Sequence, residues 1–271
     1  MESIDRLGWA AGFSFRAFGL RIGVRATAPA LLDEVRRRLP PGATESRAKI
    51  VDRLYSFVTP KPAPRGVRGY HLLYADAARL ARSLDPKEPL DAFEESLPPF
   101  VAGWSRGRIF LHAGVVGWRG RAIVLPGRTF TGKSTLVAAL VRAGATYYSD
   151  EFAVLDGRGR VHPYARPLGL RDQALCSRPT PVESLGGRAG RKPLPVALVL
   201  LSRYRAGQRF RPRVLTPARG LLRLLPHTIP IRFRPAASLD ALARAVGTAS
   251  ILEGARGEAD ETARALLALA S

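Results

Sequence analysis

The segment 127–135 holds the residues whose types and spacing are best suited to chemistry. Gly127, Gly132, Lys133 and Ser134 fit the pattern G-x-x-x-x-G-K-[ST], which cradles nucleotide phosphates. In such a loop backbone N–H groups close around phosphate oxygens, the lysine reaches the β and γ oxygens, and the hydroxyl ligates Mg²⁺. The alternative is a glycine turn before an ordinary helix. We predict a site for a nucleoside triphosphate, formed by Gly127, Arg128, Thr129, Phe130, Thr131, Gly132, Lys133, Ser134 and Thr135.

The elements around this loop are predicted from hydrophobic patterning. The apolar run 122–125 predicts a buried strand entering the loop, and apolar residues at helical spacing predict a helix over 134–143. A further strand over 108–116 and a turn at 117–120 predict an antiparallel hairpin that feeds the loop. In most folds with such a loop, the strand that leads into the loop belongs to a parallel β-α-β unit. An antiparallel hairpin before the loop therefore reduces the number of folds that fit the sequence.

Two adjacent acids follow the loop helix. Asp150 and Glu151 lie 17 and 18 residues past Lys133, after a strand predicted over 145–148. Acids at such a strand end can divide the work between a general base and a metal ligand. The alternative is that Asp150 caps a turn and Glu151 is solvated.

Other candidates are single residues. His112, on the strand before the loop, can orient a carboxylate or contact phosphate, although strand histidines also serve packing. Arg166, Arg232 and Arg234 are candidates for binding phosphate. Their spacing in the sequence does not show which of them does so.

Composition bounds the class of protein. The 271 residues carry a net charge of +21, with 16 basic and 12 acidic side chains in 1–103 against 27 and 10 in 104–271. This asymmetry favours an anionic ligand or acidic partner on the second half, the alternative being a solvated basic face. A nucleic-acid partner is not favoured, because the sequence has no recognisable nucleic-acid motif and aromatics such as Tyr204, Phe210 and Phe233 are sparse.

The sequence also predicts a cytoplasmic protein without a membrane anchor. No apolar run approaches a bilayer span, and Glu2 and Asp5 stand where a secretory signal would be basic and then apolar. The one cysteine, Cys176, excludes an intramolecular disulfide and is expected to be a small buried apolar residue.

Two domains are predicted: a small α/β domain over 1–103, in which no chemistry is visible, and a second domain over 104–271. Strands are expected over 13–24, 54–58 and 69–74, and helices over 30–39 and over 91–104, the latter broken at Pro98 and Pro99. In the second domain we expect strands over 152–155, 161–164, 196–201 and 229–233, and helices over 217–225, 239–246 and 258–269. The segment 176–195 is expected to be a mobile loop.

The order His112-Ala-Gly, GRTFTGKST, Ser149-Asp150-Glu151 and Arg166-Pro-Leu-Gly169 resembles the C-terminal catalytic domain of the HPr kinase/phosphorylase family over about residues 104–255. The second acid here is Glu151, and the loop has Phe130 where the family has a glycine, so the chain resembles a divergent member. The resemblance implies an α/β P-loop fold with a mixed sheet, related to phosphoenolpyruvate carboxykinase. It also implies ATP and Mg²⁺ as cofactors, and self-association.

The resemblance further implies that Lys133 and Ser134 bind phosphate and Mg²⁺ and that Asp150 is the base toward an acceptor hydroxyl. It also implies that Glu151 and His112 support metal and phosphate positioning, with Glu151 beside Ser134 at the metal. The first hypothesis is therefore an ATP-dependent kinase acting on a serine-type hydroxyl of a protein or peptide. The alternatives are a small-molecule kinase of the same fold and a non-enzymatic, nucleotide-dependent module with a basic partner-binding face.

Overall fold

The chain forms two compact α/β units in the computed structural model, which describes residues 2–61, 68–127, 131–171 and 177–270. The units are Met1–Arg106 and Gly107–Ser271. The domain boundary expected between 103 and 104 falls in the last turn of a helix that packs on the first unit's sheet. Arg128, Thr129, Phe130 and Cys176, named above, lie outside the described residues.

The first unit is a six-stranded sheet in the order β3-β1-β2-β4-β5-β6, with β2 and β4 parallel and the other pairs antiparallel. Helix α3 packs on this sheet, where Phe93 lies edge-on to Tyr55 and also contacts Phe57. Its elements are α1 Glu2–Asp5, β1 Ala11–Ala17, β2 Leu20–Ala26, α2 Leu31–Arg37, β3 Thr44–Ser46, β4 Arg53–Val58, β5 His71–Ala75, β6 Ala78–Ser83 and α3 Lys87–Trp104.

Two predictions in this unit were wrong. The single strand expected over 13–24 is the hairpin β1–β2, which turns at Phe18 and Gly19, both with positive φ. The helix expected to break at Pro98 and Pro99 runs through both, because its buried face, with Phe93, Leu97 and Val101, packs on the sheet and outweighs the lost backbone hydrogen bonds.

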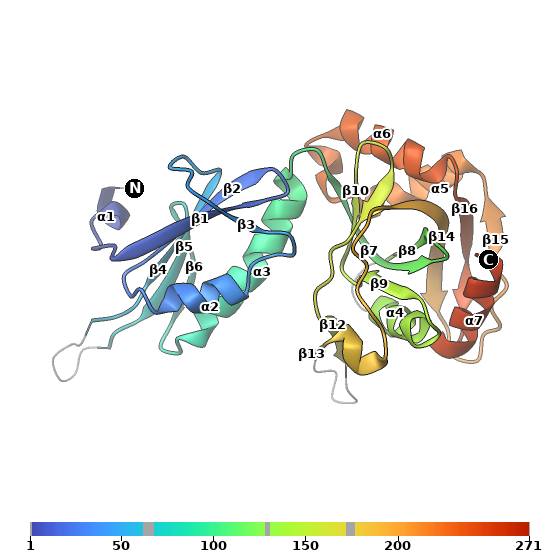
Figure 1. Cartoon of the computed structure of the whole chain (residues 1–271), viewed down its shortest axis with the longest axis horizontal. Coiled ribbons are helices and arrows are strands. Elements are labelled where there is room, and N and C mark those ends of the chain that lie inside the picture. Colours follow the sequence, from blue (N-terminus) through green and yellow to red (C-terminus); the bar gives the residue numbers. More distant parts are fainter. Residues whose placement is uncertain (1, 62–67, 128–130, 172–176, 271) are drawn as a thin grey trace. The chain divides into compact units, whose positions relative to one another are not determined.

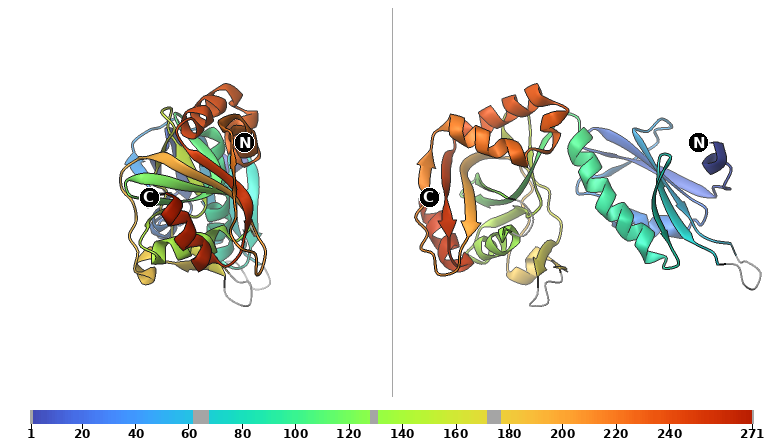
Figure 2. Two further views of the ribbon diagram at one scale, coloured as in Figure 1. Left: turned by 90° about the vertical axis from the view of Figure 1, so that its right-hand side faces the viewer. Right: turned by 180° about the vertical axis from the view of Figure 1, so that it is seen from behind.

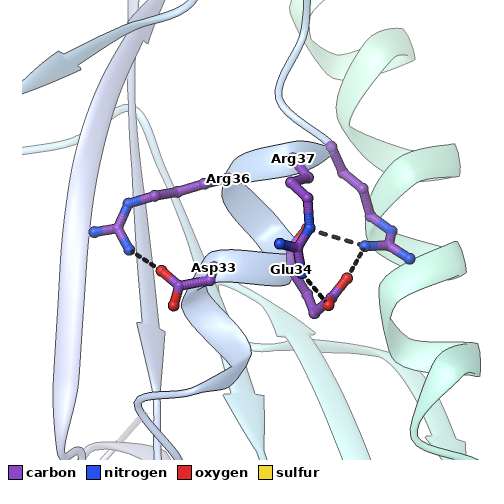
Figure 3. A network of polar contacts seen from close by, with 5 residues as sticks. Asp33, Glu34, Arg36 and Arg37 are labelled. Atoms are coloured by element: carbon purple, nitrogen blue, oxygen red, sulfur yellow. Dashed lines mark hydrogen bonds and ion pairs between the residues drawn. The ribbon is translucent and has the colours of Figure 1, made fainter.

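The surface of α2 shows how this unit balances its charges. Arg36 pairs with Asp33 at 3.0 Å, and Arg37 pairs with Glu34 (Figure 3). Arg36 also pairs with Glu45 at 3.0 Å. Exposed pairs of this kind contribute little to stability, because water screens the two charges. Their effect on the surface is to neutralise arginines that would otherwise form a positive patch.

The second unit is built on an eight-stranded mixed sheet in the order β11-β10-β7-β8-β14-β16-β15, with β9 paired to β7. Strands β8, β14 and β16 are parallel neighbours, and β7 is antiparallel to β8. The strands are β7 Ile109–Trp118, β8 Arg121–Pro126, β9 Thr146–Ser149, β10 Phe152–Leu155, β11 Arg160–His162, β14 Leu194–Tyr204, β15 Arg213–Leu215 and β16 Ser250–Arg256; β12 Leu168–Arg171 and β13 Ser177–Thr180 form a separate ribbon.

Helices cover both faces of this sheet (Figures 1 and 2). Helices α4 (Lys133–Arg142) and α7 (Ala259–Leu269) bury Val137, Leu140 and Leu266 on one face. Helices α5 (Pro217–Leu224) and α6 (Pro235–Val246) bury Leu224 and Leu242 on the other. The loop between β8 and α4 therefore lies at the sheet edge where the parallel strands β8, β14 and β16 end.

Most predicted elements of this unit are confirmed, including the β7–β8 hairpin and helix α4, but three predictions need correction. Residues 229–233, expected as a strand, include the 3-10 turn Ile229–Arg232, because Pro230 occupies its first turn. The described part of 176–195 holds β13 and the 3-10 turn Val182–Leu185 rather than an irregular loop. Strand β16, beside β14 in the sheet, was not expected. No helix in the described ranges is long and apolar enough to cross a membrane.

Candidate active site at the loop between β8 and α4

The loop joins β8 to α4 through Gly132, whose backbone conformation is one that glycine adopts without strain. Gly132 precedes the helix in the left-handed region, with φ of +76°, which favours glycine. A Cβ at this position would lie 2.5 Å from Nη2 of Arg256, so a side chain would displace that guanidinium in addition to straining the backbone. At the start of the loop, the N–H of Gly127 donates to the carbonyl of His112 at 3.3 Å. The loop is thus fixed to β7 at one end and to β16 at the other.

Arg256 holds the far end of the loop from the last residue of β16. Its Nη2 donates to the carbonyl oxygen of Gly132 at 2.8 Å and to that of Thr131 at 3.4 Å. The side chain is 2% exposed, and burial lowers the pKa of its guanidinium. Sequence analysis missed this residue, because one arginine among 38 carries no local signal and its strand was not predicted.

His112 lies beside the loop lysine. Its Nε2 is 3.4 Å from Nζ of Lys133, and its ring packs edge-on to Phe152. Burial, together with the positive charge of Lys133, lowers the pKa of His112 to about 4. The imidazole is therefore neutral near pH 7, and Nε2 can accept a hydrogen bond from the lysine ammonium. In this geometry His112 orients Lys133 and does not itself supply a positive charge.

Asp150 is held by three donors from three different elements. Ser134 Oγ donates to Oδ2 at 2.9 Å, the N–H of Gly169 donates to Oδ2 at 3.0 Å, and the Tyr147 hydroxyl lies 3.0 Å from Oδ1. A carboxylate oxygen has two lone pairs, so Oδ2 is filled whereas Oδ1 keeps one lone pair for a further donor. The structure thus brings the acid predicted as base into direct contact with the loop hydroxyl.

Tyr147 is a second residue that sequence analysis missed. Its hydroxyl lies 2.8 Å from the carbonyl of Arg166 as well as 3.0 Å from Asp150, so one proton is shared between two acceptors. Burial, and then the charge of Asp150, raises the pKa of Tyr147, which keeps the phenol protonated. The only sequence signal was its place on β9, three residues before Asp150.

Glu151 and Arg166 form the more exposed part of the site. Nη1 of Arg166 lies 3.7 Å from Oε2 of Glu151, and both side chains are partly exposed. The peptide groups are fixed more tightly, since Ser149 Oγ accepts from the N–H groups of Glu151 and Phe152 at 3.1 and 2.9 Å. A tight turn between β9 and β10 therefore fixes the backbone of Glu151 next to Asp150, whose side chain contacts Ser134 of the loop.

The oxygen atoms of Ser134 and Asp150 are suitable ligands for a hydrated divalent cation that is bound mainly through phosphate. Mg²⁺ in nucleotide sites takes one or two protein oxygens and completes its shell with phosphate and water. Ser134 Oγ is such a donor, and the carboxylate oxygen beside it belongs to Asp150 rather than to Glu151, which was expected with Ser134 at the metal. Among the described residues no cluster of three or more His, Cys, Asp or Glu side chains could hold a metal alone.

Of the arginines proposed as clamps, only Arg166 lies at this site. Arg232 is exposed, and in the described part of the chain its side chain has no hydrogen bond or ion pair. Arg234 donates to the carbonyl of Arg108 at 2.8 Å and so has a structural contact. Thr135 is exposed on the first turn of α4.

No protein-family model matches this chain, and no curated protein matches its sequence significantly.

Proposed function

We propose that this protein is an ATP-dependent kinase that transfers the γ-phosphoryl group to a serine-type hydroxyl of a protein or peptide. The observation that carries the proposal is the 2.9 Å hydrogen bond from Ser134 to Asp150. Ser134 occupies the position that ligates the nucleotide's metal in G-x-x-x-x-G-K-[ST] loops. A carboxylate in contact with it lies beside the position of the terminal phosphate, where a kinase needs its base.

The remaining lone pair on Oδ1 of Asp150 can accept a hydrogen bond from an acceptor hydroxyl. Ser134 can ligate a metal through its oxygen while its proton still points to Oδ2, so the contact need not break when the nucleotide binds. An acceptor hydroxyl would then donate to Oδ1. As its oxygen bonds to the γ-phosphorus, the bond to the bridging oxygen breaks, ADP leaves, and the proton passes to Asp150.

The remaining residues supply orientation and charge. Lys133, oriented by neutral His112, would bind the β and γ oxygens, and Arg166 would offset charge on the transferred group. Mg²⁺, held through Ser134 and phosphate, would neutralise the phosphate oxygens. The fold type proposed with this activity, that of the HPr kinase and phosphoenolpyruvate carboxykinase group, is supported by the antiparallel hairpin β7–β8 before the loop. We place the activity in the cytoplasm.

The test combines labelling with two substitutions. Purified protein, Mg²⁺ and γ-labelled ATP are incubated with lysate from its own source, and label is expected on a polypeptide. Asp150→Asn should lower transfer by about 100-fold or more, as expected for loss of a general base, with ATP binding retained. Lys133→Ala should lose both transfer and binding.

Asp260→Asn is the matched control, because this exposed acid on α7 pairs with Arg142 alone among the residues that the structure describes. It should leave transfer unchanged. Wild-type transfer by Asp150→Asn would refute the base, and label found only on metabolites would move the proposal to a small-molecule acceptor.

A further inference from the structure

A basic groove lies between α5 and the edge strand β15 on the second unit. It has a volume of about 380 Å³ and is lined by Arg213, Leu215, Arg219, Leu222, Arg223 and Glu253. Leu215 is buried in its wall, whereas Leu222 is 63% exposed. In the described chain β15 ends the sheet, so its outer backbone edge has no strand partner.

The charges of the basic groove are unbalanced. Glu253 lies 2.5 Å from Nη2 of Arg213 and 3.1 Å from Nε of Arg223, so one carboxylate faces two guanidinium groups. Arg219 has no ion pair within the described ranges, and its side chain is exposed. The groove therefore has a net positive charge that its own acid does not neutralise.

The positive surface continues towards the phosphate loop. Arg203, Arg205, Arg209 and Arg211, at the end of β14 and in the loop after it, are exposed and form no ion pair with the described residues. The N–H of Arg205 donates to the carbonyl of Arg256 at 2.9 Å. This bond fixes the loop after β14 beside Arg256, the residue that contacts Gly132 of the phosphate loop. The first unit instead pairs such arginines with carboxylates on α2 (Figure 3).

We propose that the basic groove binds an extended acidic segment of the polypeptide that accepts phosphate. That the segment belongs to the acceptor rests on the proposed function; that it is acidic and extended rests on the groove itself. Three arginines against one glutamate favour carboxylate side chains, and the open edge of β15 offers main-chain hydrogen bonds to an added strand.

A peptide fits this groove better than a nucleic acid does. The six lining residues include no aromatic side chain on which a base could stack, and two leucines offer contact to aliphatic side chains. The observations therefore favour a polypeptide whose acidic side chains alternate with apolar ones.

The spacing along β16 gives the expected position of the acidic residues. Glu253 and Arg256 are three residues apart on one strand, about 10 Å at the usual rise per residue, and their side chains lie on opposite faces of the sheet because side chains alternate along a strand. Arg256 contacts Gly132 of the phosphate loop directly. Acidic residues bound in the groove would thus be at least about three extended residues away from the serine at Asp150.

The test measures anisotropy of a fluorescein-labelled octaglutamate peptide at low salt, without ATP. Arg219→Ala should weaken binding by about two- to fivefold, the scale of one exposed charge pair. Glu253→Gln should tighten binding by a similar factor, because it frees Arg213 and Arg223 from their internal partner. Arg264→Ala and Glu261→Gln make the same charge changes on α7 and should have smaller effects.

Binding that responds equally to the groove variants and to the α7 controls would overturn the site. An eight-residue oligothymidylate that binds more tightly than octaglutamate, with the same dependence on Arg219 and Glu253, would overturn the polypeptide assignment. If both groove variants shift octaglutamate binding but leave KM for the labelled acceptor unchanged, the acceptor role fails while the groove stands. Because the binding assay needs no phosphotransfer, it stays informative even if the kinase proposal fails.

Discussion

Arg256 offers the sharpest test of how the phosphate loop is held. Its guanidinium is buried and donates to the carbonyl of Gly132 at 2.8 Å, whereas the bond to Thr131 is at the outer limit of 3.4 Å. A hydrogen bond to a charged group contributes roughly 1.5–3 kcal/mol, so the shorter bond supplies most of the anchoring. Arg256→Met removes this bond and keeps an unbranched side chain of similar length.

The substitution should separate nucleotide binding from stability. If the loop must be ordered again on binding, loss of about 1.5–3 kcal/mol raises the Kd for MgATP by roughly 10- to 100-fold. Global stability should change little, because the pKa of Arg256 is lowered by burial and an apolar side chain avoids the cost of burying the charge. Calorimetric titration measures the Kd, and thermal unfolding monitors the fold.

Arg203→Met is the matched control. Arg203 is exposed and pairs with Ala255 in the β14–β16 register, so the same charge is removed one strand away with no contact to the loop. Its Kd should stay within about twofold of wild type, the effect of one exposed charge. Wild-type affinity in a folded Arg256→Met protein would refute the anchoring argument.

Two further predictions concern the site. Tyr147→Phe removes the phenol proton shared by Asp150 and Arg166, and should lower kcat by about tenfold while leaving the ATP Kd unchanged; an unchanged kcat would show that the phenol does not position the base. The pKa of His112 is about 4 in the folded protein against 6.5 unfolded, so the unfolded chain binds more protons between these values. The unfolding free energy should fall as pH drops from about 6.5 to about 4, and His112→Asn should reduce that slope in denaturant titrations; an equal slope in both proteins would contradict the shift.

Local pattern was enough to predict the elements around the loop. Apolar runs predicted the buried strands β7 and β8, and apolar residues at helical spacing predicted α4. Both patterns are local and can be recognised in the sequence without knowledge of the fold. The phosphate-loop pattern is contiguous, so its residue types could be interpreted without knowledge of the fold. Asp150 could be expected near the loop because it ends the strand that follows the loop helix, and such a strand returns towards the loop.

Patterns that depend on partners were misjudged. The helix α3 passes through Pro98 and Pro99 because contacts with a sheet distant in sequence outweigh the local breaking signal. Strand β16 carries Glu253, Gly254 and Arg256, which do not have the composition of a buried strand, yet it is parallel to β14 in the sheet. The position of β16 depends on its pairing with β14, which cannot be predicted from the sequence of either strand alone.

The sequence by itself therefore determined the two-part α/β organisation, the phosphate-loop motif and the excess of arginine on the second half. Only the tertiary structure decided which side chains act on one another: that Asp150 rather than Glu151 contacts Ser134, that His112 is neutral beside Lys133, and that Arg256 holds the loop. The physical reason is that these contacts join residues up to 125 positions apart, and their energies depend on distance and burial, which exist only once the chain has folded.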